Sequence, residues 1–160
     1  ALTSEDWESA AELEKRIVSE CASVLTPGDL IDRRIRQGAL LGRLGDQTEA
    51  SNVLSQALLV AETAADQARL SRVLRYLGQA ELQLGASADA LSHFRRACDI
   101  HGTSGDAREK AMALVGMGNA LAQLNRKDEA RDALDQAAAI HERLGDVKGT
   151  ATIRKATNAL

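Results

Sequence analysis

The sequence predicts an all-α protein built from stacked helical hairpins, and three observations carry this prediction. A pattern repeats every forty residues, so that Gly38, Gly78 and Gly118 begin three similar segments. Apolar residues recur at helical spacing on both sides of each of these glycines. Aromatic residues, which strands favour, make up only 2% of the 160 residues. A fixed period of this size is the signature of stacked repeats, so we expect about eight antiparallel helices arranged as a solenoid.

Residues 4–24 are predicted to form an amphipathic helix ahead of the repeats, because their apolar side chains recur at helical spacing. Ala10 lies forty residues before Ala50, so this helix matches the second helix of an incomplete repeat. Glu14, however, stands where the next copy has the apolar residue Leu54. The sequence therefore leaves two interpretations open, a partial repeat and a plain capping helix.

The starts of the repeats are predicted from capping chemistry. Asp66, Asp106 and Asp146 lie forty residues apart, and Asp is a preferred N-cap residue. Counting back one more period reaches Thr26, which precedes Pro27 and so also begins a helix. These positions divide a single domain of residues 1–160 into a helix at 4–24, repeats at 26–65, 66–105 and 106–145, and a capping helix at 146–160.

The turn inside each hairpin is marked by a third set of equivalent positions. Gly45, Gly85 and Asn125 lie forty residues apart. Both residue types tolerate the left-handed backbone conformation that commonly follows a helix end. We therefore expect the first helix of each repeat to end just before these residues.

Further glycines lie inside the helices, where each costs about 1 kcal/mol relative to Ala. Gly78 is followed twelve residues later by Ala90, and Gly118 by Ala130. We expect each glycine to face the alanine of its own hairpin, because two small residues would let the helices approach closely.

The last helix differs from its counterparts in the earlier repeats. Arg154 and Asn158 occupy the places that Leu114 and Gly118 hold one period earlier. The change replaces an apolar packing face with a polar one, as the exposed end of a repeat stack requires.

Composition and motifs exclude several classes of function. The net charge of −3 gives no overall attraction for nucleic acid or for a membrane surface, and we expect neither as a partner. No signal peptide and no apolar run of about 20 residues is visible, which favours a cytoplasmic protein. Cys21 and Cys98 are interpreted as reduced thiols. No phosphate loop, nucleophile motif or metal-ligand spacing is present, so we expect no cofactor, no metal and no enzymatic activity.

The repeated columns resemble the tetratricopeptide repeat family over roughly residues 26–145. The matching features are a glycine, an alanine twelve residues later, then Leu54, Phe94 or Leu134, and then another alanine. The commonest unit of that family is about 34 residues long, and the longer unit found here is similar to the repeats of kinesin light chain, polarity scaffolds and bacterial signalling regulators. The resemblance implies a right-handed superhelical solenoid whose first helices line a concave groove that binds proteins or peptides.

Counting from the glycine positions predicts which side chains line that groove. The candidates are Arg36, Arg43, Arg72, Arg75, Tyr76, Gln79, Gln83, Asn119 and Gln123. Guanidinium groups suit carboxylates, and side-chain amides suit the backbone of an extended peptide, so an acidic segment of a partner is expected there. The alternative is that the arginines only pair with neighbouring acids such as Asp32.

These inferences favour a protein- or peptide-binding module, acting as the scaffold or sensor part of a larger regulatory protein. A structural self-association unit is the alternative, with the N-terminal helix as the contact in a homodimer. The excess of Arg over Lys and the abundance of Ala indicate a bacterial source.

Overall fold

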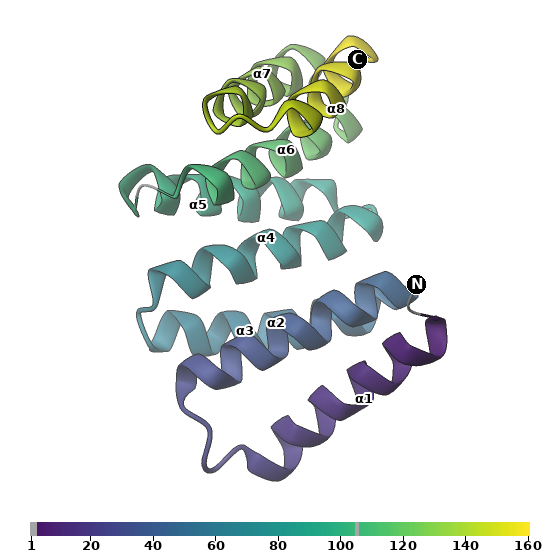
Figure 1. The fold of residues 1–160 in the computed structure, drawn as a ribbon, viewed down its shortest axis with the longest axis vertical. Coiled ribbons are helices and arrows are strands. Elements are labelled where there is room, and N and C mark those ends of the chain that lie inside the picture. The colour runs from purple at the N-terminus through teal and green to yellow at the C-terminus, as the bar shows by residue number, and fades with distance from the viewer. Residues whose placement is uncertain (1–2, 105) are drawn as a thin grey trace.

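The computed structural model describes residues 3–104 and 106–160. These residues fold into eight α-helices, which are stacked in chain order from one end of the molecule to the other (Figure 1). The helices are α1 (Ser4–Cys21), α2 (Pro27–Leu44), α3 (Gln47–Thr63), α4 (Gln67–Gln83), α5 (Ser87–Ser104), α6 (Ala107–Gln123), α7 (Lys127–Arg143) and α8 (Val147–Asn158). The predicted all-α solenoid is confirmed, although the first helix ends at Cys21 and the last at Asn158, slightly earlier than expected.

The predicted helix starts are confirmed by their hydrogen bonds. The side chains of Asp66, Asp106 and Asp146 each accept a bond from the backbone N–H three residues later, with distances of 2.9 to 3.1 Å. Thr26 accepts the equivalent bond from the N–H of Asp29 at 3.1 Å. Because each cap satisfies an N–H group that the helix itself leaves unpaired, the forty-residue spacing of capping residues sets where helices begin.

The turns also follow the predicted pattern. Gly45, Gly85 and Asn125 have φ angles of 88°, 80° and 58°, all in the left-handed region. Between repeats the same conformation occurs at Gly145, with a φ of 72°, and at Ala65, with a φ of 54°. Ala65 therefore carries the strain that a side chain meets in this region.

The side chains that meet the helical glycines lie one helical turn beyond the alanines that the sequence predicts. A methyl group placed on Gly78 would lie 3.0 Å from the Cζ atom of Phe94, and one on Gly118 would lie 2.7 Å from the Cγ atom of Leu134. Each glycine thus faces the large residue sixteen positions later. Ala90 is fully buried, and the backbone oxygen of Ala130 would lie 3.3 Å from the methyl group on Gly118. The glycines make room for a large side chain of the second helix.

A core of apolar side chains runs through the stack between successive helices. Its largest fully buried members are Phe94, Ile31, Leu54, Leu74, Leu121 and Leu134. On the first helix of each hairpin, the side chains that point away from this core form part of the protein surface. Among the described helices, none is both long and apolar enough to cross a bilayer.

Candidate binding groove

A groove runs along the face formed by α2, α4 and α6, and it consists of three adjoining hollows. The N-terminal hollow, about 320 Å³, lies between α1 and α2. The central hollow, about 380 Å³, is lined by α2, α3 and α4, and the C-terminal hollow, about 520 Å³, mainly by α4, α6 and α8. Ala39 and Arg43 line both of the first two hollows, while Tyr76 and Gln79 line both of the last two. Each hollow therefore adjoins the next through shared side chains.

Most of the side chains predicted to line the groove do so. Seven of the nine candidates line one of the three hollows, namely Arg36, Arg43, Arg75, Tyr76, Gln79, Gln83 and Asn119. The other two are not among these lining residues. Gln123 accepts a hydrogen bond from the hydroxyl of Ser87 at the start of α5, and Arg72 pairs with an acid of α2.

The predicted arginines are largely neutralised by acids of neighbouring helices. Arg72 lies 3.3 Å from Asp32 on α2, and Arg75 lies 3.1 Å from Glu109 on α6. The Arg75 guanidinium also stacks over the ring of Tyr76, with 4.4 Å to the ring centroid. The alternative raised by the sequence, in which these arginines pair with neighbouring acids, therefore describes both of them.

The N-terminal hollow combines apolar and charged groups. Trp7 and Leu13 of α1 form part of its lining. The guanidinium of Arg43 lies over the Trp7 ring, 4.7 Å from the centroid, in a cation–π contact. Arg36 lies 3.3 Å from Glu14 of α1. Arg43 is the predicted arginine that forms no ion pair with an acid in the part of the chain that the structure describes.

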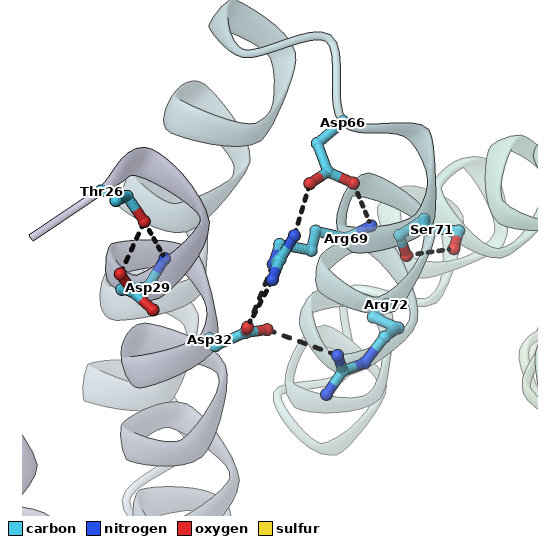
Figure 2. A network of polar contacts seen from close by, with 8 residues as sticks. Thr26, Asp29, Asp32, Asp66, Arg69, Ser71 and Arg72 are labelled. Atoms are coloured by element: carbon cyan, nitrogen blue, oxygen red, sulfur yellow. Dashed lines mark hydrogen bonds and ion pairs between the residues drawn. The ribbon is translucent and has the colours of Figure 1, made fainter.

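Arg69, which the sequence reasoning did not single out, is the centre of a charged network that ties α2 to α4 (Figure 2). Its guanidinium donates to Asp32 at 3.0 and 2.9 Å and to Asp66 at 2.7 Å. These hydrogen bonds, first with Asp32 and then with Asp66, raise the pKa of Arg69 above its usual value. The pKa of Asp66 is lowered, chiefly by the backbone N–H of Arg69 that it caps. The sequence signal was available, because Arg69 is three residues after a predicted cap.

The C-terminal hollow contains further residues that the sequence did not place in the groove, because α8 was interpreted as a cap and His141 belongs to a second helix, α7. His141, Asp146, Lys148 and Thr152 all line it. The Nδ1 atom of His141 lies 2.9 Å from the Asp146 carboxylate. The pKa of Asp146 is lowered, mainly by the N–H of Gly149 and then by His141. The acid is therefore engaged in capping α8.

Other candidate chemistry is limited in the described part of the chain. No group of three or more His, Cys, Asp or Glu side chains there could hold a metal ion. Cys21 and Cys98 are free thiols. Burial raises the pKa of the Cys98 thiol to about 11, which disfavours the reactive thiolate. The side chain of His101, which shares a repeat position with His141, lies outside the described residues.

Comparison with known proteins agrees with the repeat architecture. Residues 111–144, within α6 and α7 and the turn between them, match the sequence model of the tetratricopeptide repeat family. A Podosopora anserina protein assigned as a kinesin light chain, with nearly identical TPR-like repeats, superposes with a TM-score of 0.78 at 16% identity. That match covers 97% of this chain and 80% of the other. The chain is a tetratricopeptide-like solenoid.

Two more solved structures share this solenoid. BtubC (BKLC) from P. vanneervenii gives a TM-score of 0.70 at 17% identity, covering 94% of this chain and 61% of that one. The apo form of RapI gives 0.76 at 14% identity, covering 97% of this chain and 45% of RapI. No curated protein matches the chain by sequence. The comparisons establish the tetratricopeptide-like fold, while the groove must be interpreted from the residues of this chain.

Proposed function

We propose that this tetratricopeptide-like solenoid is a protein- or peptide-binding module that holds its partner in the groove. The observation that carries the proposal is that three hollows follow one another along the first helices, the first two sharing Ala39 and Arg43 and the last two sharing Tyr76 and Gln79. Tetratricopeptide-like repeat folds are typical of protein–protein interaction modules, and concave repeat surfaces are extended enough to hold a length of chain. This use of the fold needs no catalytic residue.

The chemistry of the groove suits an extended peptide. Gln79, Gln83 and Asn119 are exposed and line the groove, and each amide can donate to and accept from a peptide backbone. An acidic segment could pair with Arg43, which forms no ion pair with an acid among the described residues, whereas at Arg72 and Arg75 it would compete with acids of the chain. We therefore propose that an acidic segment contacts Arg43 and not Arg72 or Arg75.

The proposal can be tested with a library of random 12-residue peptides displayed on phage. Peptides enriched on the wild-type chain are measured against Gln83→Trp, which places a large ring in the central hollow. Gln136→Trp is the matched control, because Gln136 is an exposed glutamine on the second helix α7. We expect Gln83→Trp to weaken binding about tenfold or more, equivalent to about 1.4 kcal/mol. Equal binding to both variants, with helicity unchanged, would place the peptide site elsewhere.

The proposal also includes a wider role for the protein in regulation. A scaffold or sensor role within a larger regulatory protein would use the groove to recruit one partner. A cytoplasmic location suits the two free thiols, Cys21 and Cys98, because reduced thiols persist in reducing compartments.

Self-association through α1 is the second candidate function. The observation in its favour is Leu13, whose side chain is 56% exposed beside the half-buried Trp7. Against it, α1 carries six acidic and two basic residues, so two copies of the helix would repel each other. Light scattering over a range of protein concentrations tests the idea. A mass that rises with concentration in the wild type, and stays monomeric in Leu13→Glu, would support self-association.

A further inference from the structure

The C-terminal hollow lies at a repeat position where α6 carries no side chain. Arg36, Tyr76 and Gly116 lie forty residues apart and occupy equivalent places on α2, α4 and α6. The first two carry large side chains, and the third carries none. A methyl group on Gly116 would overlap the ring of Phe94, so this ring packs directly against the backbone of α6, and both residues line the hollow. The third repeat therefore differs from the first two, because a buried ring and a bare stretch of backbone line the groove there.

The lining of this hollow suits an apolar side chain. Phe94 forms the floor with Gly116, and Met112, Val115 and Ile153 form apolar walls. The volume of about 520 Å³ falls within the range of small-ligand pockets, which is roughly 300–1,000 Å³. Burying a Leu, Met or Phe side chain in such surroundings is favourable, because it removes apolar surface from water. The rim offers amides for the backbone that would carry this side chain.

The rim of the hollow also carries one uncompensated positive charge. Arg75 is paired with Glu109, and His141 is paired with the acid that caps α8. Lys148 is exposed, and within the described residues its ammonium group makes no hydrogen bond or ion pair. A carboxylate of a bound peptide could approach it without displacing an acid of the chain.

We propose that the C-terminal hollow is a specificity pocket, which takes an apolar anchor side chain of the size of Leu, Met or Phe from a peptide whose neighbouring carboxylate pairs with Lys148. This inference rests on the proposed function and deepens it, because it names the part of the groove that selects the partner. Binding energy at such interfaces is concentrated in a few anchors seated in pockets, and an apolar pocket with one unpaired cation at its rim meets that description.

The test uses the same phage library and two pairs of variants. Thr152→Phe fills the hollow, and Thr63→Phe is its control, because both threonines are exposed and donate to the carbonyl four residues earlier. Lys148→Glu reverses the charge at the rim, and Lys155→Glu makes the same charge change elsewhere on α8. We expect enriched peptides to share one apolar residue with an acid within about three positions. Thr152→Phe and Lys148→Glu should each weaken binding about tenfold, while the controls keep wild-type affinity.

The outcomes separate this proposal from the one on which it rests. If the peptides lose binding to Gln83→Trp but bind Thr152→Phe as well as the wild type, the groove function stands and the pocket is wrong. If neither variant weakens binding, both proposals fail. An enriched set without an apolar residue beside an acid, or no enrichment at all, also overturns the pocket. Circular dichroism of every variant confirms that a lost signal is not lost folding.

Discussion

The middle of the stack and its N-terminal end solve the same packing problem with different chemistry. Leu54, Phe94 and Leu134 occupy equivalent places in α3, α5 and α7, and each is at most 2% exposed. Glu14 holds the corresponding place in α1. In the middle of the stack this position is covered by helices on both sides, so an apolar side chain is required there. At the end only α2 lies beside it, and a carboxylate is tolerated.

The carboxylate at the N-terminal end is held by α2. Glu14 lies 3.0 Å from Arg33 and 3.3 Å from Arg36, and its side chain is 15% exposed. Two partners and partial solvation reduce the desolvation penalty that a fully buried charge would meet. The comparison teaches that the period specifies where a side chain packs, while the number of helices around that place decides which chemistry it can carry.

The largest expected effect comes from truncating the apolar side chain that occupies this position in the middle of the stack. Phe94→Ala should lower the free energy of unfolding by about 3–5 kcal/mol, because a fully buried ring leaves a cavity between α4, α5 and α6. Urea denaturation followed by circular dichroism measures the change. A loss below about 1 kcal/mol would mean that the middle of the stack is no more demanding than its end.

The next effect concerns the glycine above this ring. Gly116→Ala should cost about 1–3 kcal/mol, because the new methyl group overlaps Phe94 and the buried ring must shift. Gly42→Ala is the control on the neighbouring first helix α2, where the new methyl group would meet only the Gln47 side chain at 3.5 Å. That control should stabilise the protein by up to about 1 kcal/mol through helix propensity. Equal melting temperatures for the two variants would contradict the close contact.

Much of the fold could be predicted from the sequence because it depends on local chemistry repeated at a fixed spacing. Asp66, Asp106 and Asp146 cap helices through bonds that span three residues, and Gly45 and Gly85 end them through their own backbone freedom. Such features need no knowledge of what lies across the molecule. Their agreement over three copies made the helix boundaries clear.

Contacts across a hairpin could not be obtained in the same way. The period constrains equivalent positions, but twelve and sixteen residues after a glycine lie one helical turn apart on the same face of the second helix. The choice between Ala90 and Phe94 as the partner of Gly78 therefore depends on the crossing of the two helices. The pairing of Arg75 with Glu109 likewise depends on how α4 meets α6, so the neutralised charge of the groove arises from tertiary packing.

A smaller effect is expected from removing the carboxylate that occupies the equivalent position in α1. Glu14→Ala should cost about 1 kcal/mol, because its partner Arg33 is 29% exposed and Arg36 is 57% exposed, and ion pairs near water contribute little. A double-mutant cycle with Arg33→Ala isolates the pair. A coupling energy above about 3 kcal/mol would show that the N-terminal end depends on this carboxylate as strongly as the middle depends on Phe94.

The smallest effect should appear in the dependence of stability on pH, and it concerns the aspartate caps at the starts of α4 and α8. Asp66 and Asp146 have pKa values below the ordinary value of 3.8, because their carboxylates accept backbone N–H bonds in the folded state. A carboxyl whose folded pKa is lowered adds stability above its unfolded pKa and loses it as the pH falls through the folded value. The unfolding midpoint in urea should therefore decrease below about pH 4.

Replacing the caps by asparagine separates their contribution from other acid effects. Asn also caps helices well but does not titrate, so Asp66→Asn together with Asp146→Asn should keep most stability at pH 7 and lose less than the wild type on moving to pH 3. Asp132→Asn, at an exposed position on α7 beyond its first turn, is the matched control and should follow the wild type. Asp66 also binds the charged guanidinium of Arg69, whereas Asp146 binds the imidazole of His141, so Asp66→Asn should lose more stability at pH 7 than Asp146→Asn. If the double variant and the control show the same loss at low pH, the acid sensitivity comes from other carboxylates, such as those that pair with the groove arginines.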